Sequence, residues 1–128
     1  MVKTTTNNIE ISVETRYFWQ QSIPKENHYF FVYFITIENK GDFSVQLLKR
    51  HWEIFDTGDQ MRFVDGDGVV GETPIIEPNQ KYTYNSGCNL ISEIGYMKGY
   101  YEMQQLLTEK IFKVQIPKFD LIVPGKLN

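Results

Sequence analysis

Residues 45–72, VQLLKRHWEIFDTGDQMRFVDGDGVVGE, are the stretch that decides the fold. They begin with a strand-like run in which Leu48, Trp52 and Ile54 share one parity, as expected when one face of a strand is buried. The tetrapeptide DTGD then has the composition of a hairpin turn, and residues 61–64 can pair back. A glycine-rich loop, GDGVVG, follows. The stretch therefore predicts an antiparallel strand pair with Trp52 as a core anchor.

Short strand-like runs lie on both sides of this pair. The most apolar is 28–38, HYFFVYFITIE, in which nearly every side chain is aromatic or β-branched, as in the central strand of a sheet. Further runs occupy 9–19, 81–84, 94–104 and 110–116. Pro74 and Pro78 argue against a helix after the glycine loop. About seven short strands without a long helical period predict an all-β fold, an antiparallel two-sheet sandwich of immunoglobulin or fibronectin III type.

The two ends of the chain are expected to lie outside this core. Residues 1–8 are polar and predicted to be frayed, and the segment after Pro117 is predicted to be an extended tail. The length of 128 residues suits one ordinary domain. We therefore expect a single domain over residues 1–128 with its core from about 9 to 121.

Composition narrows the classes of function. The net charge is −3 and no run of Lys or Arg builds a basic stripe, so nucleic-acid binding is not expected. The single cysteine, Cys88, excludes a disulfide within the chain. The N-terminus lacks the apolar core of a signal peptide, and no stretch approaches the roughly 18 apolar residues of a membrane helix. A cytoplasmic protein without membrane association is the expectation.

The glycine loop matches GxGxxG at Gly66, Gly68 and Gly71. A dinucleotide-binding unit would need a helix after the motif, and the segment TPIIEPNQ offers none. Two interpretations stay open. The glycines can simply permit positive φ angles or close backbone approach. Alternatively, successive backbone N–H groups form an anion-binding loop from Gly66, Asp67, Gly68 and Gly71, with Arg50 and Lys49 as the balancing charges.

Acidic side chains around the same loop raise the possibility of a metal site. Asp65, Asp67 and Glu72 would repel an anion but could bind a divalent cation through carboxylate oxygens. The spacing does not match an EF-hand, because Val70 stands where that loop needs glycine. Solvated turn carboxylates are the alternative.

A catalytic centre has little support in the sequence. His51 and Cys88 could in principle form a base–nucleophile pair, but no neighbouring residue supplies an orienting group. With His28 they are too scattered to suggest a zinc site. The sequence therefore predicts a protein that is not an enzyme and needs no cofactor.

Several motifs together resemble one family. In order they are ITIENKG (35–41), VQLLKRHWEIFD (45–56), VDGDGVVGETPIIEPNQ (64–80), YTYNSG (82–87), GYMKGYYEM (95–103) and FKVQIPKFDL (112–121). This series closely resembles the ApaG family, also called CorD, from about residue 9 to residue 121. No single motif would be specific, but their order is.

The resemblance implies a small bacterial protein with a fibronectin III-like sandwich and no established biochemical function. It also implies a genetic link to cobalt and magnesium resistance or efflux, and a role as a protein-interaction module. Tyr96, Tyr100 and Tyr101 look exposed and would suit a protein interface or a homodimer. The alternative is phosphate, nucleotide or divalent-metal binding at the loop 65–72.

Overall fold

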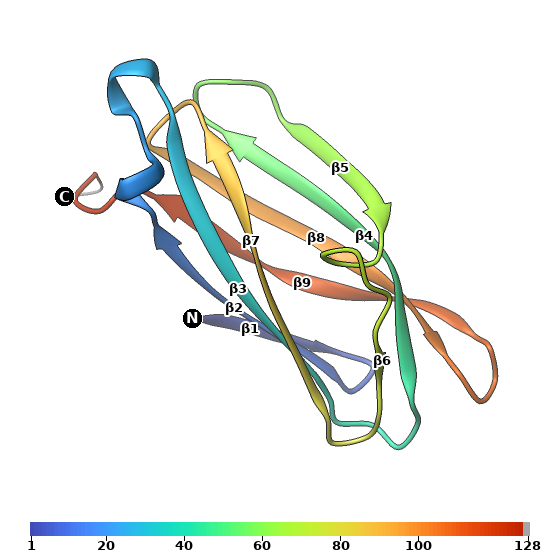
Figure 1. The fold of residues 1–128 in the computed structure, drawn as a ribbon. Coiled ribbons are helices and arrows are strands. Elements are labelled where there is room, and N and C mark those ends of the chain that lie inside the picture. Colours follow the sequence, from blue (N-terminus) through green and yellow to red (C-terminus); the bar gives the residue numbers. More distant parts are fainter. Residues whose placement is uncertain (127–128) are drawn as a thin grey trace.

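The computed structural model describes residues 1–126 as two antiparallel β-sheets packed face to face (Figure 1). The strands are β1 (Val2–Thr6), β2 (Ile9–Tyr17), β3 (Tyr29–Asn39), β4 (Val45–Asp56), β5 (Arg62–Asp67), β6 (Ile75–Ile76), β7 (Lys81–Leu90), β8 (Ile94–Gln105) and β9 (Ile111–Ile122). One sheet has the order β1-β2-β3-β7 and the other β5-β4-β8-β9, with β6 also pairing to β4. The expected all-β sandwich of immunoglobulin or fibronectin III-like type is confirmed.

Strand β3 is the centre of the four-stranded sheet, as its apolar sequence predicts. It pairs with β2 on one side and β7 on the other, and it buries Phe31 and Ile35 in the core. Its outer face is also partly covered. Phe18 packs edge-on against Phe30 with ring centroids 6.3 Å apart, and the segment that carries Phe18 continues into two short 3-10 helices, Trp19–Gln21 and Pro24–Glu26.

A β-bulge in β4 changes which side chains face the core. The pairing of β4 with β8 shifts between Leu47 and Lys49. Before the bulge Leu47 is fully buried, whereas after it Trp52 and Ile54 are buried. Leu48, which lies at the shift, is only half-buried and does not join Trp52 in the core, contrary to the expectation from parity. An extra residue reverses the inside–outside alternation, and a strict period of two cannot anticipate it. Trp52 is a core residue, as predicted.

The strands extend further than the sequence patterns indicate, and there are nine among residues 1–126 rather than about seven. Residues 2–6, expected to be frayed, form β1 and pair with β2 through a turn at Asn7 and Asn8. Both asparagines have positive φ, as a two-residue hairpin turn requires. Strand β7 continues through Gly87 to Leu90, and β9 continues through Pro117 to Ile122. Tertiary pairing thus orders segments that local sequence left as loop or tail.

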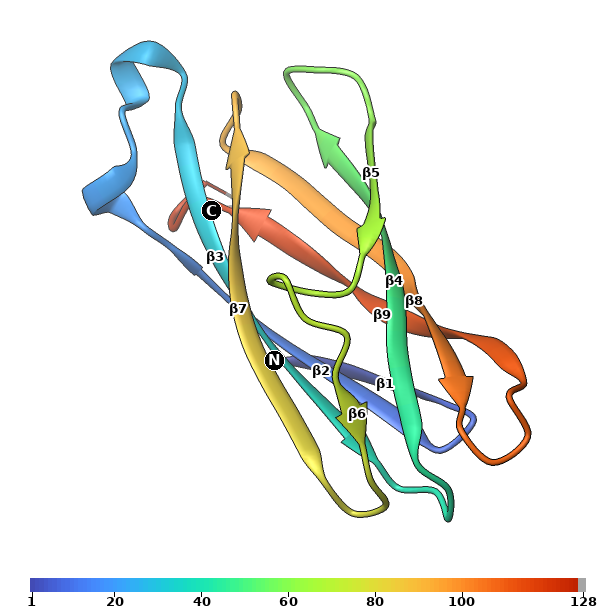
Figure 2. The ribbon, with the colours of Figure 1, turned by 45° about the vertical axis from the view of Figure 1, so that its right-hand side comes forward.

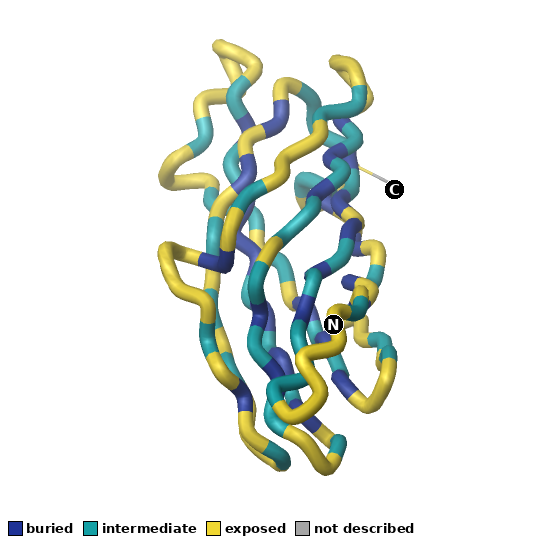
Figure 3. The backbone as a smooth tube through the Cα atoms, turned by 90° about the vertical axis from the view of Figure 1, so that its right-hand side faces the viewer, coloured by how far each residue is buried: buried dark blue, intermediate teal, exposed yellow. Residues whose placement is uncertain are grey.

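Each end of the sandwich has a buried polar side chain that is hydrogen-bonded to neighbouring segments. At the end of β4, Asp56 is fully buried and accepts hydrogen bonds from the backbone N–H groups of Gly58 (3.2 Å) and Ile91 (2.7 Å) and from the Ser92 hydroxyl. At the opposite end, Asn39 is also fully buried and bonds to the neighbouring turns. Figure 3 shows buried positions alternating with more exposed ones along the strands between these ends.

No helix within residues 1–126 is both long enough and apolar enough to cross a membrane.

Buried acidic groups should make the protein sensitive to alkali. Burial raises the pKa of Tyr84 and of Tyr101, whose hydroxyls share a hydrogen bond, and burial raises the pKa of the Cys88 thiol from 9.0 to about 11. The unfolded chain releases the thiol proton first, so the contribution of Cys88 to stability is full below pH 9.0 and is lost as the pH rises through about 11; that of the two tyrosines is lost at higher pH. Urea unfolding should show a loss of about 2–3 kcal/mol from the thiol over this interval, and Cys88→Ala should show a smaller loss. Equal pH dependence in both proteins would contradict this assignment.

Candidate functional site

The glycine segment is part strand and part tight turn. Gly66 and Asp67 belong to β5, where they pair with Arg50 and Lys49 of β4. The backbone N–H of Gly68 then donates to the carbonyl of Leu48 at 2.8 Å. In the turn that follows, residues 69–72, the N–H of Val69 donates to the carbonyl of Glu72 at 2.8 Å, and the N–H of Glu72 donates to the carbonyl of Val69 at 3.0 Å. Most of the backbone donors that an anion-binding loop would need are therefore engaged within the protein.

Arg50 fastens this segment to the inner side of the sheet. Its Nη1 donates to the carbonyl oxygens of Asp67 (2.9 Å) and Gly68 (3.1 Å). The guanidinium lies directly over Gly66, where an added Cβ would come within 2.7 Å of it. Gly66 thus makes room for the arginine side chain. The structure brings together the predicted residues Arg50, Gly66, Asp67 and Gly68, but the arginine contacts carbonyl oxygens of the loop and so serves the fold.

A polar cleft remains between the tip of this loop and β7. In Figure 2 the loop after β5 projects toward β7. The cleft holds about 240 Å³, with Arg50 and Gly71 on one side and Ser86 on the other. Its other lining residues are Tyr33, Trp52, Val69, Val70, Tyr84 and Asn85. Within residues 1–126 the backbone N–H groups of Val70 and Gly71 make no hydrogen bond to the protein. They are the loop donors that a ligand could still use.

Val70 occupies a strained conformation at this tip. Its φ is 48°, in the left-handed region that a β-branched residue rarely adopts, and its side chain is 65% exposed. Asparagine tolerates this region, so Val70→Asn should raise the free energy of unfolding by about 1 kcal/mol in urea denaturation. The matched control is Val64→Asn in strand β5, which should not stabilise. A destabilised Val70→Asn protein would show that the valine makes contacts that outweigh the strain.

The acidic side chains near the loop are not gathered into a metal site. Asp65 lies 2.6 Å from Nδ1 of His51, and Glu72 accepts a hydrogen bond from the Tyr82 hydroxyl at 2.8 Å. Within residues 1–126 no group of three or more His, Cys, Asp or Glu side chains is placed to hold a metal ion. The structure therefore does not bring Asp65, Asp67 and Glu72 together.

The outer face of the five-stranded sheet carries stacked aromatic side chains, which we call the aromatic face: Phe55, Phe63, Tyr96, Tyr100 and the imidazole of His51. The imidazole is stacked on Tyr100 at 4.8 Å and lies 6.3 Å from the ring of Phe63. Phe55 and Tyr96 stack at 5.0 Å. Phe63 is 64% exposed. A flat, partly exposed set of rings of this kind is typical of protein interfaces.

Two lysines border the aromatic face, and both lie over tyrosine rings. Lys113 Nζ is 4.6 Å from the ring centroid of Tyr100, and Lys118 Nζ is 4.3 Å from that of Tyr96.

Tyr101, expected to be exposed with its neighbours, is fully buried instead. Adjacent residues of a strand point to opposite faces, so Tyr100 and Tyr101 cannot both be exposed here. Sequence patterns missed Phe63 and His51, because only strand pairing brings them together. The β4–β8 pairing places His51 opposite Tyr100, and the β4–β5 pairing brings Phe63 beside His51.

Comparison with known proteins agrees with the fold. A family model described as the ApaG domain matches residues 19–105. Protein ApaG of Pseudomonas paraeruginosa is 44% identical over 125 residues, which covers 97% of this chain and 98% of that protein. Protein ApaG of Shewanella sediminis is 46% identical over 122 residues, covering 95% and 96% of the two chains.

Solved structures agree as well. The crystal structure of a putative ApaA protein from Bordetella pertussis matches with a TM-score of 0.88 at 36% identity, covering 98% of this chain and 100% of that one. An X-ray structure of a structural-genomics target matches with a TM-score of 0.88 at 43% identity, covering 95% and 92%. The fold is thus that of a small immunoglobulin-like or fibronectin III-like β-sandwich protein. The chain belongs to the ApaG family.

Proposed function

We propose that this protein is a non-catalytic interaction module that docks a protein partner on the aromatic face. The observation that carries the proposal is the stack of Phe63, His51 and Tyr100 on the outer surface of the five-stranded sheet. Aromatic rings held against one another lose little conformational freedom on binding, so they suit the centre of an interface. The family resemblance links such proteins to cobalt and magnesium resistance, and we expect the partner to act in that process.

The surroundings of the stack support protein docking over a small-molecule site. Asp65 and Glu53 both lie beside the imidazole, at 2.6 and 3.3 Å, while Lys113 lies over Tyr100. Rings at the centre with charges of both signs around them match the usual anatomy of an interface core and rim. A second copy of the chain could present the same surface, so a homodimer is one form that the interaction can take.

Site-specific photo-crosslinking tests the proposal. A photoreactive phenylalanine at Tyr100 should crosslink one defined protein in cells, whereas the same residue at Thr83, on the outer face of the opposite sheet, should not. Phe63→Ser should weaken the crosslink at Tyr100 while leaving the circular dichroism spectrum unchanged. A crosslinked species of twice the chain mass would identify the homodimer. Equal crosslinking from Tyr100 and Thr83, or none from either, would refute docking through this face.

A growth assay tests the link to metal resistance. A strain that lacks the gene should be more sensitive to cobalt, and the wild-type gene should restore growth while the Phe63→Ser gene should not. Restored growth with both genes would separate the aromatic face from metal resistance.

Anion binding in the cleft beside Gly71 is the second candidate function. The observation that favours it is the combination of the Arg50 guanidinium with two unengaged backbone N–H groups in one recess. Phosphate or pyrophosphate is the expected ligand class. Calorimetric titration with pyrophosphate should give binding that Val70→Asp weakens, because asparagine and aspartate tolerate the left-handed conformation and the new carboxylate repels the ligand. Val70→Asn is the neutral control, and equal affinity in the two variants would refute an anion site.

A further inference from the structure

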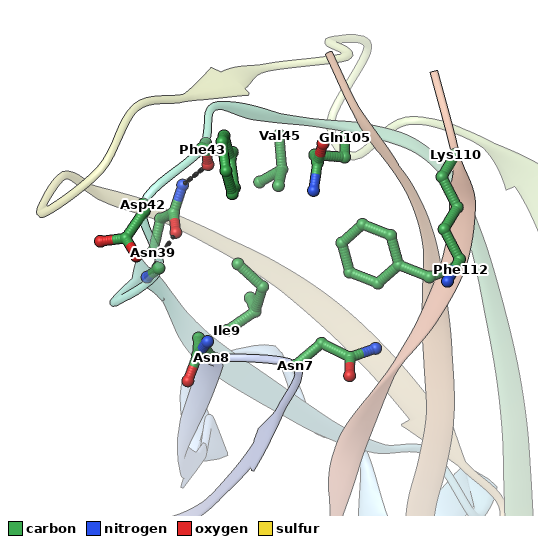
Figure 4. A pocket seen from close by; sticks show the side chains of 11 residues that line it. Asn7, Asn8, Ile9, Asn39, Asp42, Phe43, Val45, Gln105, Lys110 and Phe112 are labelled. Atoms are coloured by element: carbon green, nitrogen blue, oxygen red, sulfur yellow. Dashed lines mark hydrogen bonds between the residues drawn. The ribbon is translucent and has the colours of Figure 1, made fainter. Parts of the chain in front are cut away.

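The end of the sandwich at which β4 begins carries a second, separate pocket, which we call the end pocket (Figure 4). It holds about 330 Å³, within the range of small-molecule sites. Three connections between strands enclose it: the β1–β2 hairpin turn at residues 7–8, the β3–β4 turn at 40–44, which joins the two sheets, and the β8–β9 hairpin turn at 106–110. The pocket adjoins Val45, the first residue of β4, whereas Gly66 and Asp67 of the glycine loop pair with Arg50 and Lys49 further along the strand.

The floor and walls of the end pocket are apolar. Ile9 and Val45 are almost fully buried and form its floor, while Phe112 is half-buried and Phe43 is 47% exposed at the mouth. In Figure 4 the rings of Phe43 and Phe112 stand on either side of the space above Ile9. A hydrocarbon chain or ring between them would remove apolar surface from water, which is favourable.

Two polar side chains at the opening, Lys110 and Gln105, present donors, and the carboxamides of Asn7 and Asn8 lie on the side of the β1–β2 turn. Figure 4 shows the Lys110 side chain running down beside Phe112, and the amide nitrogen of Gln105 directed toward the space. The amide oxygen of Gln105 already accepts a hydrogen bond from the Thr108 hydroxyl at 2.9 Å, so its NH₂ group remains to donate. Asp42 also lines the pocket, but its carboxylate points away from the centre in Figure 4. The opening therefore favours an anionic group.

Hydrogen bonds hold the lining turns in place without a ligand. The fully buried amide of Asn39 donates to the carbonyl of Phe43 at 2.8 Å and accepts from the backbone N–H of Gly41 at 2.9 Å. The β3–β4 turn is joined to the β1–β2 turn by the bond from Lys40 N–H to the Asn8 carbonyl, 2.8 Å. Because the walls are preformed, a ligand would lose little affinity to ordering them.

We propose that the end pocket binds a small amphipathic carboxylate, an aliphatic or aromatic acid with one negative charge. Its apolar part contacts Ile9, Val45 and Phe112. Its carboxylate accepts charge-assisted hydrogen bonds from the Lys110 ammonium and the Gln105 amide, and the bond from the lysine joins two charged groups. This site is distinct from both the aromatic face and the cleft beside Gly71, so its failure would leave the proposed function untouched.

Titration of ¹⁵N-labelled protein with hexanoate, followed by amide chemical shifts, tests the proposal. We expect saturable shifts confined to the amides of Asn8, Ile9, Gly41, Gln105 and Phe112, with a millimolar dissociation constant. Hexan-1-ol, which matches the chain without the charge, should bind at least about tenfold more weakly. Lys110→Met should weaken hexanoate about tenfold, whereas Lys25→Met, at the far end of the sandwich, should leave it unchanged.

Three outcomes would overturn the site. Shifts spread over the whole surface would mean that hexanoate has no defined pocket. Equal affinity for hexanoate and hexan-1-ol would remove the role of the carboxylate. Unchanged hexanoate affinity in Lys110→Met, with an otherwise unchanged amide spectrum, would remove the role of the lysine.

Discussion

Replacement of Trp52 by alanine is expected to lower the free energy of unfolding by about 3–5 kcal/mol. The indole is 3% exposed and meets two other rings edge-on, Tyr33 at 5.3 Å and Phe119 at 5.8 Å. These rings come from β3, β4 and β9, so the cluster joins the two sheets at their centre. Removing the indole would leave a cavity that strands held by their hydrogen-bonded neighbours cannot close by a small shift.

Urea unfolding followed by far-ultraviolet circular dichroism is the measurement, because the one tryptophan that the variant retains, Trp19, is exposed and would report little of the unfolding. Trp52→Phe is the matched control and should lose less than Trp52→Ala, since it keeps an aromatic ring in the space. Trp19→Ala should be nearly neutral, because that side chain is 71% exposed. A loss below about 1 kcal/mol for Trp52→Ala would mean that the core repacks around this position.

Replacement of Gly68 by alanine is the second large effect, with an expected loss of about 3 kcal/mol. An added Cβ would stand 2.1 Å from the carbonyl oxygen of Glu72, and φ at this residue is +61°. The obstacle is backbone rather than a flexible side chain, so the turn must open to admit the methyl group. Opening it would break the bond between the N–H of Val69 and the carbonyl of Glu72.

Gly71→Ala is the matched control, because its added Cβ meets nothing within 4 Å and only its φ of +78° opposes the change. We expect a loss of about 1 kcal/mol there. Urea denaturation of the two variants under identical conditions measures the difference. Equal losses would show that the loop rearranges freely around Gly68. The same comparison shows why a bulky change at Gly68 is a poor probe of ligand binding, since it disrupts the loop itself.

Much of the fold could be predicted from residue patterns. The apolar run at 28–38 indicated a central strand, and β3 is one. The tetrapeptide at 56–59 indicated the turn between β4 and β5, and Trp52 indicated a core anchor. These signals are local, since alternation and turn residues report the environment of each strand directly.

The wrong predictions of strand ends and burial have physical causes that no short stretch of sequence contains. Strand β1 is polar and is ordered by pairing with β2, and β9 continues through Pro117 because a neighbouring strand supports it. The bulge in β4 shifted the alternation, so that Leu47 rather than Leu48 is buried. For the candidate site, the sequence placed Gly66, Gly68 and Gly71 in one motif but could not assign their separate roles. Those roles depend on what stands opposite each glycine: the Arg50 side chain, the Glu72 backbone and open space.

The sandwich, its central strand, its aromatic core anchor and the family could all be predicted from the amino-acid sequence, because alternation, turn residues and the order of motifs indicate each of them. Tertiary structure alone decided which aromatic rings face outward together, what occupies the space around the glycine motif, and that three turns enclose a pocket at one end. Each of these is a meeting of residues far apart in the chain, set by strand pairing and by the bulge in β4.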